Sequence, residues 1–459
     1  MQKILETTNA IIWGIPVLSM ILVVGILLSI RSRFAQIRLF PLAFRKFLQG
    51  FQKSGKGKAG ISGYSALCTA LAATVGTGNI AGVAGAIAIG GPGVIFWMWI
   101  CALLGMVTKL AEVTLALKYR TKNSAGEYVG GPMYVIKHGL PKKYHFLAYF
   151  YSFFGIVAAF GVGNATQVNA VVDGMKSIAV LVGIDFGMPQ ALILGTVLTI
   201  LILTAFKRGA GGIGSWTEKL VPIAAIGYIL LAAGVLISRN AQIPHAVSAI
   251  ISGAFNPKSA TCGVIGYAFL TLRVGASRGV FTNEAGMGTA SIAHAAADVS
   301  HPVEQGFMGV IEVFLDTIVI CTLTALVILC SGVSIPFGSD PGITLTMEAF
   351  SVVYGDWCQV LITGLVCIFA FATILGWGLY GARCAQFLFG EGAWKVFTFA
   401  QIGAVMLGVI LNTSVVWVLA EIVNGLMAIP NLIALVILSP EFMGILNDYQ
   451  SKRKAYSCE

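Results

Sequence analysis

Residues 73–82 read Ala73-Thr74-Val75-Gly76-Thr77-Gly78-Asn79-Ile80-Ala81-Gly82 and interrupt an apolar stretch, Tyr64 to Ile89, that is long enough to span a bilayer. Closely spaced glycines and small polar residues break a helix, and the N–H and C=O groups that this frees inside a membrane need a partner other than lipid. That partner is usually a bound ion or substrate. The stretch therefore predicts a discontinuous membrane helix with a ligand at its break.

The composition excludes a soluble globule and predicts an all-α polytopic membrane protein. Hydrophobic residues make up 57% of the 459 residues, charged residues make up 10%, and the mean hydropathy is +0.87. A soluble domain has roughly 25% charged residues. The length allows on the order of 10–12 spans. We expect eleven, at about 11–30, 63–88, 92–117, 146–173, 189–206, 217–238, 263–283, 304–330, 357–383, 393–411 and 415–438.

The positions of the basic residues predict the orientation of the chain. They crowd into the first and third connections, which fall on one side of the membrane together with the C-terminal tail. The positive-inside rule then places the N-terminus outside and the C-terminus in the cytoplasm, in the cell (inner) membrane. The net charge of +10 is thus a topology signal, and no nucleic-acid partner is expected. The basic residues are Arg31, Arg33, Arg38, Arg45, Lys46, Lys53, Lys56 and Lys58 in the first connection, and Lys118, Arg120, Lys122, Lys137, Lys142 and Lys143 in the third.

Two pairs of ionisable residues lie inside expected spans, where burial is costly enough to suggest a function. Lys109 and Glu112 are one turn apart, and we interpret them as a pair near a helix end, with the lysine reaching toward the cytoplasmic surface. Glu312 and Asp316 are spaced i, i+4 on one face of the eighth span. They form either a proton or cation relay or interhelical hydrogen bonds.

Two amides share a face of the fourth span, Asn164 and Gln167, among the small residues Gly161, Gly163 and Ala165. Small residues let helices approach closely, so the amides can serve as a hydrogen-bonded clasp between helices. An amide both donates and accepts hydrogen bonds, so the pair can also bind a zwitterionic ligand. The choice depends on whether the fourth span faces the broken helix.

A second interrupted segment predicts an internal repeat. The seventh span contains Gly275 and Gly279 and carries Arg273 and Arg278. If the broken second span opens a group of five helices, the seventh span opens the next group. Breaks at matching positions of two five-helix halves are typical of an inverted-repeat secondary transporter with its site at the midplane.

This repeat predicts the organisation of the chain. We expect an extra N-terminal span and a basic cytoplasmic connection in residues 1–62, the transporter core in 63–440, and a cytoplasmic tail in 441–459. The two repeats of the core are expected at about 63–238 and 263–438.

The motifs of enzymes and cofactor sites do not fit a helical membrane protein. Gly275-Ala276-Ser277-Arg278-Gly279 matches the nucleophile elbow of hydrolases, but that elbow needs an α/β sheet. No Walker pattern is present, and the nine cysteines are scattered singly, without a C-x-x-C pair. We therefore expect neither catalytic residues nor a cofactor.

Four blocks of the sequence carry a resemblance to a known family. They are Thr74-Val75-Gly76-Thr77-Gly78-Asn79-Ile80-Ala81-Gly82-Val83-Ala84, Gly90-Gly91-Pro92-Gly93-Val94-Ile95-Phe96-Trp97-Met98-Trp99, Gly126-Glu127-Tyr128-Val129-Gly130-Gly131-Pro132-Met133-Tyr134 and Arg278-Gly279-Val280-Phe281-Thr282-Asn283-Glu284-Ala285-Gly286-Met287-Gly288. From about Gly63 to Pro440 the chain closely resembles the alanine or glycine:cation symporters, also called sodium:alanine symporters, which have the leucine-transporter fold. Thr282 stands where we expect serine, and it keeps the hydroxyl.

The resemblance agrees with the chemistry of the break and implies a substrate site. Half-helix N-termini present unpaired N–H groups and a positive dipole end, so backbone amides at the break are candidates for binding an amino-acid carboxylate. Bulky aromatic residues would close the pocket around a small side chain, with Phe369 and Phe371 among them, and Gln167 would meet the polar head group. The implied substrate-binding residues are Gly76, Thr77, Gly78, Asn79, Gln167, Phe269, Thr271 and Trp377.

The leucine-transporter fold also implies sodium sites. One would use carbonyls near Ala72 and Val75 with the hydroxyl of Thr373. A second would draw on Thr74, Asn79 and Thr271, although not every member of the fold uses two ions.

The resemblance thus implies symport of sodium with alanine, glycine or serine by alternating access, with no enzymatic activity. Its partners would be the amino acid, the sodium ion and the lipid bilayer, and no oligomeric state is indicated. Two alternatives stay open: a proton-coupled or exchange transporter with Glu312 and Asp316 as carriers, and a channel in which the broken helices form a filter.

Overall fold

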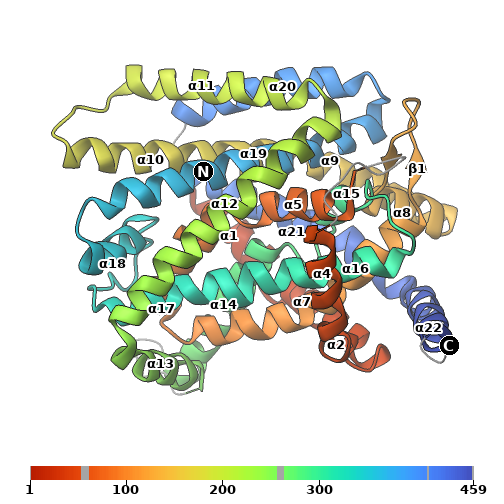
Figure 1. Ribbon diagram of the computed structural model, residues 1–459, viewed down its shortest axis with the longest axis horizontal. Coiled ribbons are helices and arrows are strands. Elements are labelled where there is room, and N and C mark those ends of the chain that lie inside the picture. The colour runs from red at the N-terminus through yellow and green to blue at the C-terminus, as the bar shows by residue number, and fades with distance from the viewer. Residues whose placement is uncertain (1, 53–60, 256–262, 411–412, 457–459) are drawn as a thin grey trace.

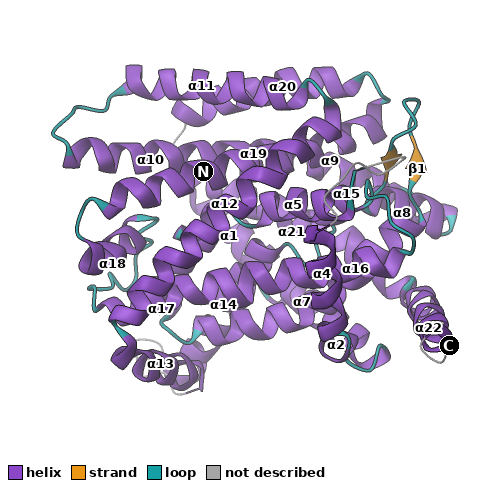
Figure 2. Ribbon diagram, in the orientation of Figure 1, coloured by secondary structure: helices purple, strands orange, loops and turns teal. Residues whose placement is uncertain are grey.

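The computed structural model describes residues 2–52, 61–255, 263–410 and 413–456. These residues form helices and their connections, apart from one short hairpin of β1 (Thr121–Lys122) and β2 (Tyr128–Val129) (Figure 2). The all-α fold predicted from the sequence is therefore confirmed. Lys53, Lys56 and Lys58 of the first basic connection lie outside the described residues.

The chain folds into a succession of helices with few long loops. Up to residue 255 they are α1 (Gln2–Ile12), α2 (Ile15–Arg31), α3 (Ala35–Arg38), α4 (Phe40–Gln52), α5 (Gly63–Thr74), the 3-10 turn η1 (Thr77–Asn79), α6 (Ala81–Gly90), α7 (Val94–Lys118), α8 (Pro132–Gly139), η2 (Lys142–Tyr144), α9 (Phe146–Phe160), the π-helix η3 (Gly161–Ala165), α10 (Thr166–Leu181), α11 (Met188–Phe206), α12 (Gly209–Ser238), η4 (Asn240–Gln242) and α13 (Ile243–Phe255).

The second half repeats this mixture of long helices and short breaks. Its elements are α14 (Gly263–Asn283), α15 (Ala290–His294), α16 (Pro302–Val313), the π-helix η5 (Phe314–Cys321), α17 (Thr322–Ser331), α18 (Thr344–Tyr354), α19 (Cys358–Phe389), α20 (Ala393–Ile410), α21 (Thr413–Ile437) and α22 (Ser439–Tyr456).

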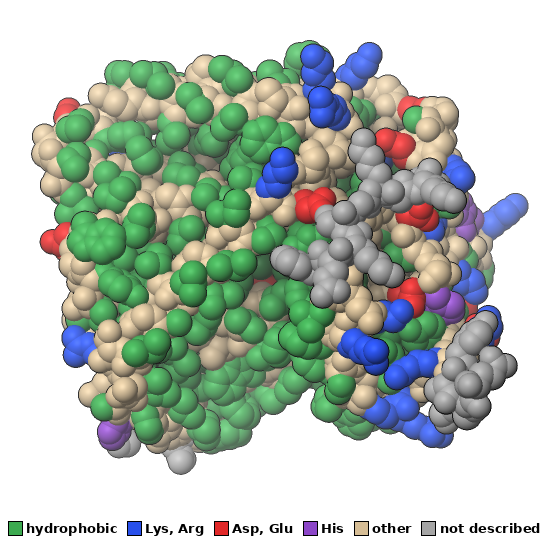
Figure 3. All heavy atoms as spheres, in the orientation of Figure 1, with side chains coloured by type: hydrophobic (Ala, Val, Ile, Leu, Met, Phe, Trp, Pro, Cys, Tyr) green, Lys and Arg blue, Asp and Glu red, His purple; other side chains and the backbone are tan. Residues whose placement is uncertain are grey.

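The lengths and composition of these helices suit a membrane. Within the described residues, eight helices are long and apolar enough to cross one, and two bent pairs raise the number to ten. Large apolar side chains cover much of the face seen in Figure 3. Each of the eleven expected spans overlaps a helix or a helix pair, while the count of eleven and the inverted repeat stay predictions.

Two helices hold the centre of the molecule, and most of the others run between its two ends (Figure 1). α7 packs against α14 and α16, and α19 packs against α5, α9, α10 and α12. One end of the molecule carries α13 and α18, and the other carries α8, the hairpin and α22. Through α7 and α19, helices from the first and second halves of the chain pack against each other.

The two helix breaks differ in how well the sequence located them. The first separates α5 from α6 at residues 75–80 with a bend of 58°, where it was predicted. The second was predicted at Gly275 and Gly279, but α14 is continuous through both. There a Cβ on Gly275 would lie 2.5 Å from the Val94 carbonyl oxygen of α7, so these glycines serve close helix packing.

The chain instead breaks after Asn283, before the short helix α15. Three residues of this turn have left-handed backbones, with φ of 54° at Glu284, 94° at Gly286 and 77° at Gly288. Glycine adopts this region at little cost. A tight turn, and not glycine spacing on one helix face, therefore sets the second break.

Candidate functional site

The break between α5 and α6 is pinned by one side chain, Asn79. Its Oδ1 accepts a hydrogen bond from the backbone N–H of Gly76 at 2.8 Å, and its Nδ2 donates to Oδ1 of Asp316 at 2.6 Å. Asn79 and Asp316 are both fully buried. The expected binding residue Asn79 thus lies at the break, where it holds the backbone open and fastens it to the π-helix η5.

The backbone amides next to Asn79 are available to a ligand. The N–H of Gly76 is used by Asn79, but within the described part of the chain no group accepts a hydrogen bond from the N–H of Thr77 or Gly78. Buried backbone N–H groups nearly always have a partner. The two amides, at the N-terminal side of α6, are therefore the candidates for binding an anionic group.

The end of α14 lies opposite Gly78. A Cβ on Gly78 would be 3.6 Å from the ring of Phe281 and 3.6 Å from the methyl group of Thr282. The hydroxyl of Thr282 lies 3.4 Å from that of Thr317, which also accepts from Nδ2 of Asn283 at 3.1 Å. The end of α14 at the second break thus places the polar side chains of Thr282 and Asn283 near the first break.

The fourth expected span supplies Gln167 to the same place. The hydroxyl of Thr77 donates to Oε1 of Gln167 at 3.1 Å, so Gln167 faces the break. Asn164 does not: its side chain donates to the Ala159 carbonyl at 2.8 Å, and its Oδ1 lies 3.4 Å from Nε2 of Gln401 on α20. The π-helix η3 adds a residue to the turn between the two amides, which turns them to different neighbours.

The long helix α19 brings the expected sodium ligands together. The hydroxyl of Thr373 donates to the Ala72 carbonyl at 2.9 Å, and a Cβ on Gly76 would lie 2.7 Å from the same hydroxyl. Val75 leaves the helical conformation at the end of α5, which frees its carbonyl from the helix. Thr74 lies beside them, but its hydroxyl donates to the Ala70 carbonyl of its own helix at 3.2 Å.

The aromatic residues expected to close the pocket are spread over several surfaces. Trp377 is buried and packs against Gly163 of η3, where a Cβ would lie 2.2 Å from Cβ of Trp377. Phe369 and Phe371 are buried against Tyr228 and Trp216 of α12. Phe269 is 50% exposed on the outside of α14. Placing Phe269 in the pocket wall was therefore incorrect.

Thr271 also lies away from the break. Its hydroxyl donates to the carbonyl of Gly90 at 3.1 Å, at the far end of α6. Because α14 continues for three turns beyond Thr271, the residues that reach the break are Phe281, Thr282 and Asn283. None of these three was predicted as a site residue, although all three belong to the block of family resemblance that ends in Gly286-Met287-Gly288.

The buried ionisable residues form a network that the sequence did not predict. Lys109 Nζ lies 3.2 Å from Oε1 of Glu312, whose Oε2 lies 3.0 Å from Nε2 of His294, and all three side chains are fully buried. Glu112 accepts hydrogen bonds from the Gly286 N–H at 2.9 Å and from Nδ2 of Asn431 at 2.7 Å. Lys109 and Glu112 are therefore not a pair at a helix end.

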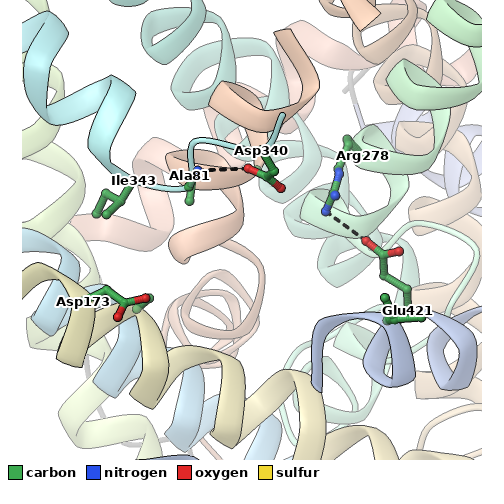
Figure 4. Close-up of a pocket in the computed structure, with 10 residues that line it drawn as sticks. Ala81, Asp173, Arg278, Asp340, Ile343 and Glu421 are labelled. Carbon is green, nitrogen blue, oxygen red and sulfur yellow. Dashed lines mark hydrogen bonds and ion pairs between the residues drawn. The ribbon is translucent and has the colours of Figure 1, made fainter. Parts of the chain in front are cut away.

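A cavity of about 390 Å³ leads toward the break from the end of the molecule that carries α18. Arg278 of α14 and Glu421 of α21 form an ion pair across it at 3.0 Å. Asp340 lies beside Ala81 at the start of α6, and Asp173 of α10 lies at another part of the same hollow (Figure 4). The cavity thus reaches Ala81 and Gly82 at the start of α6, with an ion pair at its wall.

Comparison with known proteins identifies the family. The model of the sodium:alanine symporter family matches residues 1–458. The chain belongs to the sodium:alanine symporter family. It is therefore a membrane transporter and not an enzyme, and its resemblance to this family is confirmed.

Relatives within the sodium:alanine symporters carry different substrate names. The sodium/alanine symporter AgcS of Methanococcus maripaludis is 41% identical over 441 residues, which cover 95% of this chain and 94% of AgcS. The probable sodium/glutamine symporter GlnT of Bacillus subtilis is 36% identical over 465 residues, which cover 99% of this chain and 93% of GlnT.

A solved structure supports the architecture. The crystal structure of MhsT in complex with L-phenylalanine matches with a TM-score of 0.57 and 15% identity, covering 82% of this chain and 88% of MhsT. At this identity the similarity shows the fold alone. This chain thus has the fold of the leucine-transporter class, as the family resemblance implied.

Proposed function

We propose that this protein imports alanine, glycine or serine together with sodium by alternating access. The observation that carries the proposal is the pair of free amides at Thr77 and Gly78, placed next to the contact between Thr373 and the Ala72 carbonyl. The amides and the N-terminal end of α6 suit a carboxylate. Gln167, which faces Thr77, would contact the polar head group, and Phe281 would limit the space for a side chain.

Sodium would bind beside the substrate. Neutral carbonyl and hydroxyl oxygens are ligands that a small hard cation accepts. Ala72, Val75 and Thr373 offer three of them, and Thr74 offers a fourth if its hydroxyl turns from its own helix. Moving one elementary charge through 100 mV supplies about 2.3 kcal/mol, which corresponds to roughly fiftyfold accumulation of a neutral amino acid.

We place the protein in the cell (inner) membrane with its N-terminus outside and its C-terminus in the cytoplasm. Lysine and arginine side chains gather toward the end that carries α8 and α22 (Figure 3). By the positive-inside rule that end is cytoplasmic. The cavity with Arg278 and Glu421 would then open to the outside and admit the substrate.

Uptake of labelled alanine into proteoliposomes tests this function. We expect accumulation with an inward sodium gradient and none without it, and competition by glycine and serine. Accumulation driven by a proton gradient in the absence of sodium would overturn sodium coupling and favour carriage by Glu312 and Asp316. Competition by glutamine stronger than by glycine would instead assign the substrate class named for GlnT, and unitary currents in planar bilayers would indicate a channel.

Thr373 is the most direct test of the sodium site. Thr373→Ser keeps the oxygen and should retain transport, whereas Thr373→Val keeps the shape but removes the ligand. We expect Val to raise the sodium concentration for half-maximal uptake about tenfold, the effect of a loss of about 1.4 kcal/mol. Sodium titrations of alanine uptake measure this. Equal sodium dependence in the two variants would exclude Thr373 as a ligand.

Trp377 tests which aromatic residue sets the size of the pocket. Trp377→Leu should let leucine and valine compete with alanine at roughly tenfold lower concentrations, since one methylene in a pocket is worth about 1–3 kcal/mol. Phe369→Leu is the matched control, because Phe369 lies on the same helix but packs against Tyr228 of α12. A competition profile that widens equally in both variants, or in neither, would assign Trp377 to packing.

A further inference from the structure

Glu421 is held from two directions at once. Its Oε1 pairs with Nη1 of Arg278 at 3.0 Å, and its Oε2 accepts a hydrogen bond from Nδ2 of Asn9 at 2.6 Å. Its backbone carbonyl also accepts from the indole N–H of Trp13 at 2.6 Å. Both oxygens of the carboxylate are therefore engaged, one by α14 and one by the N-terminal helix α1.

The packing of α1 on α21 is close enough to fix this arrangement. One turn beyond Glu421, a Cβ on Gly425 would lie 2.4 Å from Cγ2 of Ile12 and 3.2 Å from Nε1 of Trp13. Only glycine lets the two helices approach to this distance, and Trp13 is buried in the contact. Because the helix is packed in this way, the amide of Asn9 is presented to the carboxylate at a fixed position.

The ion pair lies near the candidate site, at the cavity that reaches the start of α6. The Arg278 guanidinium is 6.0 Å from the ring of Phe281, which in turn lies opposite Gly78 at the first break. Both partners of the ion pair line the 390 Å³ cavity. A change in the position of Glu421 would thus alter both the width of the cavity and the placement of α14.

We propose that the N-terminal helix α1 positions the ion pair that narrows the cavity on the outer side of the transporter. In this role Asn9 directs the carboxylate of Glu421 toward Arg278. This rests on the proposed alternating access. Residues 2–12 precede the segment 63–440 that the sequence assigned to the transporter core. In the proposed role they act on the core through α21. Hydrogen bonds to charged groups are among the stronger ones, and a carboxylate held at both oxygens cannot rotate away from its partner.

Loss of the Asn9 amide should free one oxygen of Glu421 and shift the protein toward a state in which the cavity is open. The Arg278 pair would remain, but it would lose its fixed geometry. The two side chains are only partly exposed, at 18% and 16%, so the contribution of this pair depends on its geometry. The expected consequence is faster access to the cavity from the side that carries α18.

The test uses the full chain with one added cysteine, Ala170→Cys, which lines the cavity. A charged, membrane-impermeant methanethiosulfonate reagent is added to proteoliposomes, and the rate of modification is compared with that of the chain without this cysteine. Asn9→Ala should raise the rate about tenfold, the factor expected for one hydrogen bond to a charged group. Asn9→Gln, which keeps the amide donor, should restore a rate close to that of the parent.

Two further variants separate positioning from a general effect on α1. Thr8→Ala is the matched control, because the hydroxyl of Thr8 is exposed and donates to the Ile4 carbonyl of its own helix. Glu421→Gln also removes the charge that pairs with Arg278, so it should raise the rate at least as much as Asn9→Ala does, and adding Asn9→Ala to it should raise the rate no further. An unchanged rate in Asn9→Ala, an equal rise in Thr8→Ala, or additive effects of Asn9 and Glu421 would overturn the proposal. The modification rate is measured without substrate, so failure of this proposal can be distinguished from failure of sodium-coupled uptake.

Discussion

Asn79→Ala is expected to abolish sodium-driven alanine uptake. The change removes the acceptor for the Gly76 amide and the donor to Asp316, both of which are buried. Leaving buried polar groups unpaired costs about 1–3 kcal/mol each. The backbone at the break would then relax, and the amides of Thr77 and Gly78 would lose their shared orientation. Labelled alanine uptake at saturating sodium measures the loss.

Two variants show whether this loss is specific to the break. Asn164→Ala removes another buried amide, which contacts Ala159 and Gln401 and does not face the break. It should lower stability by a similar amount while keeping sodium-dependent uptake. Asp316→Asn keeps an oxygen that can accept from Asn79 and should preserve the fold. If Asn79→Ala transports alanine at the rate of the parent, the break is not held by this side chain.

Lys109→Met is expected to destabilise the protein by about 3–5 kcal/mol, the usual cost of removing one partner from a buried ion pair. Both side chains of the Lys109–Glu312 pair are fully buried, and among the described residues Glu312 would keep His294 as its remaining charged or titratable partner. The loss of stability is measured as a lower midpoint of unfolding in detergent, with tryptophan fluorescence as the signal. Lys109→Arg should recover part of the loss because it keeps the charge.

The effect of Lys109→Met is compared with that of breaking a surface ion pair and with that of a double variant. Lys46 pairs with Glu304 at 2.6 Å, but the two side chains are 34% and 22% exposed, so Lys46→Met should cost about 0–1 kcal/mol. Combining Lys109→Met with Glu312→Gln should be milder than Lys109→Met alone, since no unpaired carboxylate is left. A double variant at least as unstable as the sum of the single ones would contradict this electrostatic origin.

The first helix break shows what a sequence pattern can locate. Gly76, Gly78 and Asn79 mark it because they lie within four positions of one another and the side chain of Asn79 accepts a hydrogen bond from the nearby N–H of Gly76. The second break was misplaced at Gly275 and Gly279, since a glycine that packs against α7 and a glycine that turns the chain look alike in a sequence. Only the left-handed φ values at Gly286 and Gly288 distinguish them.

The amides on the fourth span illustrate a second limit. Spacing of i, i+3 places Asn164 and Gln167 on one face of a regular α-helix. The π-helix η3 shifts this register, so that only Gln167 faces Thr77. At this π-helix the carbonyls of Ala159 and Val162 accept hydrogen bonds from the side chains of Asn164 and Gln167, five residues further on. The i, i+3 spacing does not record such an irregularity.

The sequence by itself determined the membrane class, the helical fold, the place of the first break and the family. These follow from composition and from residues that are adjacent along the chain. The tertiary structure decided that Phe269 and Thr271 lie away from the site, that Phe281, Thr282 and Asp316 lie at it, and that Lys109 pairs with Glu312 and not with Glu112. The physical reason is that a buried charge or amide is bound by whichever group the packing of distant helices brings within about 3 Å. Spacing along one helix does not record that distance.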